Sequence, residues 1–251
     1  ARAALASDVE LVEDYPTRYS VDVSRHHRWA RGDWQLLPFI FGRSGVPGLS
    51  RWKMIDNLRR SLTPVFWLFA SIAGWTLLPF MLAVQWQALL VFSLFFALTF
   101  DVVNSFLPRG MEVTASGHFT SFMREVAFAS AQVTLRIVFL AHTAWSMGDA
   151  IVRTLYRMFV SHRRLLEWRT ASQMARSGAN TIVGYYQSMW GAPVVAVVGL
   201  AIPAAAGSTG AYVAAFFSVL WLASPAIAWL VSRSAETEDR LIVAPEDATS
   251  L

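Results

Sequence analysis

Two long stretches without a charged residue place the strongest limits on what this chain can fold into. Residues 61–100 run for forty positions, and residues 177–232 for fifty-six, without Asp, Glu, Lys or Arg. A helix rises about 1.5 Å per residue and needs about 20 apolar residues to cross the hydrocarbon core of a bilayer. Each stretch is therefore long enough for two membrane-spanning helices. We expect spans near residues 63–83, 88–107, 187–206 and 210–231.

The composition agrees with a membrane protein. Hydrophobic residues make up 55% of the chain, charged residues 15%, and the mean hydropathy is +0.42, whereas about 25% of the residues of a soluble domain are charged. The sequence has no cysteine, which excludes a disulfide framework and a thiolate metal site. We predict an all-α membrane protein with about four transmembrane helices, interfacial amphipathic helices and a short strand at residues 7–12.

The distribution of basic residues predicts the topology. The net charge of +4 comes almost wholly from arginine, and the basic residues gather at 51–60 and 153–176. The expected turns, at residues 85–87 and 207–210, carry no charge. Basic residues favour the cytoplasmic side of a membrane, so we expect both ends of the chain in the cytoplasm. The positive charge is explained by this topology and gives no reason to expect a nucleic acid partner.

Residues 110–180 leave two alternatives. Charged residues interrupt the apolar density there: Arg124, Glu125, Arg136 and Asp149. Each such residue at the bilayer centre costs about 2.5–3.5 kcal/mol. We therefore favour helices that lie along the cytoplasmic face over a tilted span across residues 119–147. Residues 151–168 form a basic amphipathic pattern, which indicates either anchoring to lipid headgroups or a cover over a neighbouring active site.

Arginine, histidine and tryptophan gather at residues 24–35, ahead of the first uncharged stretch. We predict that residues 17–43 form an amphipathic helix at the membrane interface, with an apolar side and a charged side. The apolar side holds Val21, Trp29, Leu36 and Leu37, and the charged side holds Arg25, Arg28, Arg31 and Asp33. Arg25 and Arg28 are three residues apart, so both can reach one anion.

This cluster has two interpretations. Guanidinium groups bind phosphate oxygens, and indole rings offer flat apolar faces, which together suit a phosphorylated, ring-bearing substrate. A basic aromatic belt that only anchors the chain to lipid headgroups is the alternative. His26 and His27 have no carboxylate or cysteine at a ligand spacing that suggests a metal, so we predict no metal site here.

Part of the cluster resembles a known motif. Arg28-Trp29, preceded at three positions by Arg25, is similar to the Gln-x-x-Arg-Trp motif of processive family-2-like glycosyltransferases such as the cellulose, chitin and hyaluronan synthases, with arginine in place of glutamine. Residues 9–16 and 27–35 resemble a narrower family, the bacterial cyclic β-1,2-glucan synthases, and residues 159–171 agree with this resemblance.

The resemblance implies an enzyme, the membrane-embedded C-terminal part of a processive, inverting glucosyltransferase that moves glucose from UDP-glucose to a growing β-glucan. It implies the bacterial inner membrane, a GT-A-type domain upstream and a phosphorylase-like domain downstream on the same polypeptide. A divalent cation (Mg²⁺ or Mn²⁺), an Asp-x-Asp motif and the catalytic base are expected upstream, so we expect the chain alone to be inactive. Asp14 is a second candidate for the base, and an ordinary acidic loop is the other interpretation of that residue.

The resemblance also implies residue roles. Arg28 is expected to face the diphosphate of UDP, and Trp29 is expected to be the platform on which the acceptor glucose stacks, so these two are the expected catalytic residues. The expected substrate-binding residues are Arg25, Arg31, Asp33 and Trp34. Structural anchoring is the alternative for the last three.

These expectations divide the chain into six segments. They are the edge of a glycosyltransferase domain (1–24), an interfacial motif helix with a basic linker (25–60), a transmembrane hairpin (61–107), cytoplasmic-face amphipathic helices (108–180), a second hairpin (181–232) and a polar linker (233–251). A polytopic transporter or membrane scaffold is the competing class. A transporter is expected to carry ionisable residues or broken, repeated helices in its spans, and neither long stretch holds a charged residue.

Overall fold

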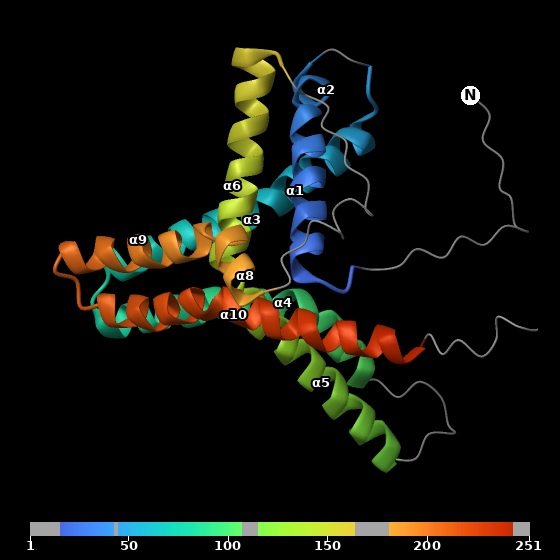
Figure 1. Ribbon diagram of the computed structural model, residues 1–251, viewed down its shortest axis with the longest axis vertical. Helices are drawn as coiled ribbons and strands as arrows, with labels where there is room; N and C mark the ends of the chain where they lie inside the picture. The colour runs from blue at the N-terminus through green and yellow to red at the C-terminus, as the bar shows by residue number, and fades with distance from the viewer. Residues whose placement is uncertain (1–15, 43–44, 107–114, 164–180, 243–251) are drawn as a thin grey trace, which may run out of the picture.

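The computed structural model describes residues 16–42, 45–106, 115–163 and 181–242, which are almost entirely helical (Figure 1). The elements in chain order are α1 (Tyr19–Gln35), α2 (Leu37–Phe41), α3 (Gly48–Leu77), α4 (Phe80–Phe106), α5 (Ala115–Val138), α6 (Leu140–Tyr156), the π-helix η1 (Arg157–Ser161), α8 (Ile182–Ser188), α9 (Gly191–Ala205) and α10 (Ala211–Ile242). No strand occurs among these residues, so the all-α prediction is confirmed for them. The strand expected at residues 7–12 lies outside the described residues.

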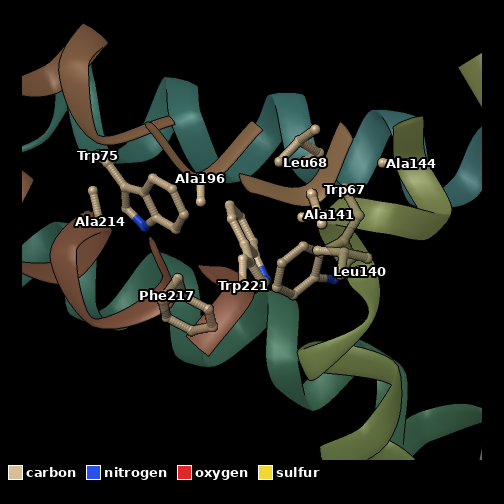
Figure 2. Packing of buried hydrophobic residues seen from close by; sticks show 11 residues of the cluster. Trp67, Leu68, Trp75, Leu140, Ala141, Ala144, Ala196, Ala214, Phe217 and Trp221 are labelled. Atoms are coloured by element: carbon tan, nitrogen blue, oxygen red, sulfur yellow. The ribbon is translucent and has the colours of Figure 1, made fainter. Parts of the chain in front are cut away.

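The second half of α3 packs with α4, α9 and α10 into a bundle. Its core contains four large aromatic side chains, Trp67, Trp75, Phe217 and Trp221 (Figure 2). The ring centroid of Trp75 lies 5.6 Å from that of Phe217 and 5.8 Å from that of Trp221. Small residues complete the core: Ala141, Ala144, Ala192, Ala196 and Ala214. Small residues let membrane helices approach closely, and the large rings fill the remaining space.

Among the described residues, the last helix is long and apolar enough to cross a membrane on its own. By length and composition, Ala211–Arg233 of α10 can cross a membrane as a single helix, and the span expected at residues 210–231 corresponds to it. Two bent pairs qualify only if each pair is one broken span: Phe119–Val138 with Leu140–Ser161, and Ile182–Ser188 with Gly191–Ala205. Phe80–Phe96 is apolar but shorter. The described residues therefore hold one such helix, or up to three, and the expected total of about four stays a prediction.

The first expected turn was placed wrongly. Helix α3 ends at Leu77 and α4 begins at Phe80, so the chain turns at residues 78–79 and not at 85–87. Proline disfavours helical backbone in the residue before it, and Leu78, which precedes Pro79, is extended (φ −105°, ψ 143°). The polar residues that suggested a turn belong to α4 instead. There the Trp86 indole N–H donates to the Ala70 carbonyl at 2.9 Å.

The second expected turn is confirmed. Helix α9 ends at Ala205 and α10 begins at Ala211. Gly207 has a left-handed backbone (φ +66°), which glycine adopts without steric cost. Gly210 lies so close to the backbone carbonyl of Trp75 that a β-carbon would not fit there. The turn between the last two bundle helices therefore depends on glycine at two positions.

Helices α5 and α6 are separated by a bend of 59°. The Trp221 indole N–H of α10 donates to the carbonyl of Ile137, in the last turn of α5, at 3.1 Å. Beyond the bend, α6 lies beside α1, and both run across the direction of α9 and α10 (Figure 1). The pair can be one broken span by length and composition, and helices that lie along the cytoplasmic face stay a prediction.

Candidate functional site

Helix α1 carries the arginine and tryptophan cluster. It ends at Gln35, and the chain continues as the short helix α2, which has a proline in its first turn, a position where the missing N–H costs nothing. The single helix expected over residues 17–43 is therefore two helices. On α1, the buried Ala30 packs with Met147 and Ala150 of α6. The small side chains of Ala30 and Ala150 allow the two helices to lie close together.

Hydrogen bonds fix α1 against α6 and α3. His27 Nε2 lies 2.9 Å from Asp149 Oδ2 of α6, and Asp149 also accepts two hydrogen bonds from Arg153. The Trp34 indole N–H donates to Ser61 Oγ of α3 at 2.9 Å. The packed side of α1 consists of residues at helical spacing: His27, Ala30, Arg31 and Trp34.

The burial of two residues of α1 does not follow the predicted apolar and charged sides. Trp29, expected on the apolar side, is 56% exposed, and Arg31, expected on the charged side, is 9% exposed. The packed side of α1 combines apolar contacts of Tyr19 and Ala30 with hydrogen bonds of His27 and Trp34. Hydrophobicity alone therefore does not mark all of it.

A cleft of about 560 Å³ opens between α1, the third and fourth turns of α3 and Met147 of α6. It brings together three of the predicted site residues, Arg28, Trp29 and Asp33. The other residues that line it are His26, Ala30, Gly32, Asn57, Arg60, Ser61 and Met147. The cleft therefore combines guanidinium, indole, carboxylate and amide groups in one place.

Asp33 is held in the cleft by a hydrogen bond from α3. The Asn57 side-chain amide donates to Asp33 Oδ1 at 3.1 Å. Partial burial raises the pKa of Asp33, while the Asn57 hydrogen bond and the charge of Arg60 oppose that rise. The carboxylate keeps a second oxygen with which it can accept hydrogen bonds from a ligand.

Trp29 is surrounded on its own helix by charged neighbours. The guanidinium carbon of Arg25 lies 4.9 Å from the indole centroid, and the His26 ring meets the indole edge-on at 5.3 Å. Asp22 Oδ1 lies 3.0 Å from Arg25 Nη2, and His26 Nδ1 lies 3.0 Å from the Asp22 backbone carbonyl oxygen and 3.3 Å from Asp22 Oδ2. The hydrogen bond between His26 and Asp22 lowers the pKa of Asp22 and raises the pKa of His26.

Three predicted site residues do not line this cleft. Arg25 lies over the Trp29 ring, and Arg31 is buried on the packed side. Trp34 lines a separate, apolar groove of about 850 Å³ formed with α2, α3 and α4. From these positions, none of the three side chains lines the space in which a ligand in the cleft would lie.

Sequence reasoning missed the residues that other helices contribute. Asn57 and Arg60 of α3 line the cleft, although residues 51–60 were interpreted only as a basic, topology-setting segment. Their three-residue spacing was the available signal, because it places both on one helix face. Asp149 was interpreted as an interruption of a span, and its bond to His27 had no signal in the sequence.

Asp33 is bonded to the neutral amide of Asn57, and three other aspartates around the site are already paired with cationic side chains of the protein. Among the residues that the structure describes, no three His, Asp or Glu side chains gather as metal ligands. The pairs are Asp22 with Arg25, Asp56 with Arg59 and Arg60, and Asp149 with Arg153. These residues do not fit a divalent-cation site, and ligands for the implied cation are still expected upstream of this chain. Asp14 lies outside the described residues.

Comparison with known proteins gives one informative match. No family model matches the chain. A curated relative, the cyclic beta-(1,2)-glucan synthase NdvB of Rhizobium meliloti (strain 1021), is 51% identical over 247 residues. The match covers 98% of this chain and 9% of the length of the relative. The chain is thus similar, over nearly its whole length, to one segment of a much longer protein, which confirms the resemblance seen in the sequence.

Proposed function

We propose that this chain, which matches a segment of a cyclic β-1,2-glucan synthase, is the membrane part of a processive, inverting glucosyltransferase. It transfers glucose from UDP-glucose to a growing β-glucan, with a cyclic β-1,2-glucan as product. The observation that carries this proposal is the cleft beside α1, which gathers Arg28, Trp29 and Asp33 of the motif with Arg60 of α3. Together these groups can bind a phosphate, a sugar ring and sugar hydroxyls.

The arginines of the cleft act on the leaving group. Transfer from a nucleotide diphosphate sugar releases a diphosphate, and positive groups placed where this charge develops stabilise the transition state. Guanidinium groups bind phosphate oxygens through two parallel N–H bonds. We assign Arg28 to the departing diphosphate. Arg60 adds positive charge from the facing helix, where Arg59 and Arg60 share the single carboxylate of Asp56.

Trp29 acts on the acceptor. Its exposed indole lines the cleft and offers a flat apolar face to the terminal glucose. A flat ring binds through contact area more than through directed bonds, so successive sugars can slide past it as processive synthesis requires. Asp33, at the same wall, accepts hydrogen bonds from sugar hydroxyls.

The remaining parts of the reaction are assigned to the rest of the polypeptide. A base must take the proton of the acceptor hydroxyl, and we place this base, an Asp-x-Asp motif and the divalent cation in a GT-A-type domain upstream. A phosphorylase-like domain follows downstream. The six-segment division of the chain, the bacterial inner membrane and the cytoplasmic position of both ends belong to the same proposal, and the chain alone is expected to be inactive.

Two substitutions test the proposal in the intact protein, in membrane vesicles supplied with radiolabelled UDP-glucose. Arg28→Ala is expected to lower glucose incorporation by at least about 100-fold, the usual effect of removing a group that stabilises transition-state charge. Trp29→Ala is expected to lower it by at least about tenfold, through loss of the stacking surface. The amount of protein in the membrane should stay unchanged in both.

Matched controls come from α3. Trp52→Ala removes an exposed indole and Lys53→Ala removes an exposed cation, and neither residue lines the cleft, so incorporation should stay near wild type. Full activity of Arg28→Ala or Trp29→Ala would contradict the proposal. If instead less of each variant is found in the membrane and its activity per molecule is unchanged, the cluster is a lipid-headgroup anchor. This is the interpretation that goes with a membrane scaffold or transporter.

A further inference from the structure

We infer that Asp22, Arg25 and His26 are positioning residues for the Trp29 indole, so that Arg25 acts on acceptor binding and not on the diphosphate. This step rests on the proposed function, in which Trp29 is the platform for the acceptor glucose. It changes the sequence-based role of Arg25 from substrate binding to positioning. It also gives a role to Asp22, which belongs to no motif in the sequence.

The four residues form one stripe on α1. Residues 22, 25, 26 and 29 are spaced as i, i+3, i+4 and i+7, which places them on the same face over two turns of helix. Asp22 is at the base of the stripe. Its carboxylate accepts from Arg25 at 3.0 Å and lies 3.3 Å from His26 Nδ1, and its backbone carbonyl oxygen lies 3.0 Å from the same His26 nitrogen. Both of these side chains then reach forward to the indole of Trp29.

The two contacts restrict a side chain that has little other packing. Trp29 is 56% exposed, and an exposed side chain can exchange between rotamers at little cost. The Arg25 guanidinium lies over the ring at 4.9 Å, within the range of a cation–π interaction. His26 meets the same ring edge-on, with 68° between the ring planes. Together they hold the indole in one orientation at the wall of the cleft.

The position of Arg25 separates it from the expected diphosphate site. Arg28 lines the cleft, whereas Arg25 does not. The Arg25 side chain is only 19% exposed, and one of its nitrogens bonds to Asp22. The two arginines therefore do not converge on one anion, although their three-residue spacing predicted that they could. A neutral glutamine at position 25 could not make the cation–π contact.

The test separates the two substrates kinetically. The intact protein in membrane vesicles is assayed with a β-1,2-linked glucose oligosaccharide as added acceptor, and KM is measured separately for this acceptor and for UDP-glucose. Arg25→Met is expected to raise the acceptor KM by about three- to fivefold and to leave the UDP-glucose KM within about twofold. Arg25→Lys keeps a cation in reach of both partners and should restore the acceptor KM to within about twofold of wild type.

Asp22→Asn tests the base of the stripe. It should raise the acceptor KM in the same direction by about twofold, and the Asp22→Asn/Arg25→Met double variant should be no worse than Arg25→Met alone, because residues that act through one contact are not additive. Arg233→Met is the matched control, since the Arg233 guanidinium also lies over an indole, that of Trp229, at 5.0 Å, does not line the cleft and should change neither KM.

An unchanged acceptor KM in Arg25→Met, or any rise of its UDP-glucose KM beyond about twofold, overturns the inference. If Arg25→Met does not accumulate in the membrane, Asp22→Asn decides: a raised acceptor KM supports the inference and an unchanged one overturns it. Trp29→Ala, measured in parallel, distinguishes failure of the proposed function from failure of this inference. Full activity in that variant ends the proposed function itself, whereas an inactive Trp29→Ala beside an unaffected Arg25→Met ends only this inference.

Discussion

Removal of the Asp149 carboxylate tests whether α6 holds the motif helix α1 in place. The contact between Asp149 and His27 joins the two helices at 2.9 Å. A hydrogen bond to a charged group contributes about 1.5–3 kcal/mol, and partial exposure of both side chains (35% and 22%) reduces this to about 1–1.5 kcal/mol. The pair between Asp149 and Arg153 lies within α6 and does not bind α1. Asp149→Ala should therefore loosen α1 by about 1–1.5 kcal/mol.

Backbone hydrogen exchange of the intact protein, followed by mass spectrometry, measures how often the amides of α1 open. Since about 1.4 kcal/mol corresponds to a factor of ten in an equilibrium constant, peptides from residues 19–35 should exchange about five- to twelvefold faster in Asp149→Ala. Asp149→Asn keeps an oxygen that can accept from His27, so its effect should be smaller. Peptides from α9 should not change.

Asp56→Ala is the matched control for Asp149→Ala. Asp56 also serves arginines, at three and four residues beyond it, but all of these side chains belong to α3. Exchange in residues 19–35 should therefore stay at the wild-type rate. The reasoning is refuted if Asp149→Ala leaves α1 exchange unchanged, or if only α6 peptides respond.

Three further predictions concern the bundle and the motif helix. Trp221→Ala should cost about 3 kcal/mol, since it leaves a cavity in the aromatic core, and should lower the apparent unfolding temperature of the detergent-solubilised intact protein. Gly210→Ala should also lower this unfolding temperature, because overpacking against Trp75 costs about 1–3 kcal/mol. An unchanged unfolding temperature would contradict the close approach of Gly210 to Trp75. The contact between His26 and Asp22 should be complete between about pH 4 and about pH 6.5, because the pKa of His26 is raised and that of Asp22 is lowered. It is lost as pH rises through the raised pKa or falls through the lowered one. Asp22→Asn should return the pKa of His26 toward its ordinary value, as measured by exchange of the imidazole C2 hydrogen.

The helices were predictable where the sequence carries strong local signals. Residues 210–231 are uncharged, and the glycines at 207 and 210 mark the turn before them, so both features appear in the structure. The first turn lies at Pro79 and not at the polar residues 85–87, which gave the more visible signal in the sequence. The backbone restriction that proline imposes on the residue before it decides the break, whereas polar side chains can stay within a helix.

The site was predictable as a segment and not as an arrangement. Arg28, Trp29 and Asp33 share the cleft as the motif suggested. Arg31 differs because the packed side of α1 is determined by partners on other helices, which the helical period of α1 does not reveal. Asn57 enters the cleft for the same reason, since its position depends on how α3 crosses α1. Tertiary packing of polar groups leaves no periodic trace in one helix.

The hydrogen bond from Trp221 to the Ile137 carbonyl has a mechanical consequence. Through this bond, helix α10 is attached to the junction between α5 and α6, and α6 packs against α1. A displacement of α10 would therefore act on the junction between α5 and α6 and, through α6, on α1 and its Trp29 indole at the cleft.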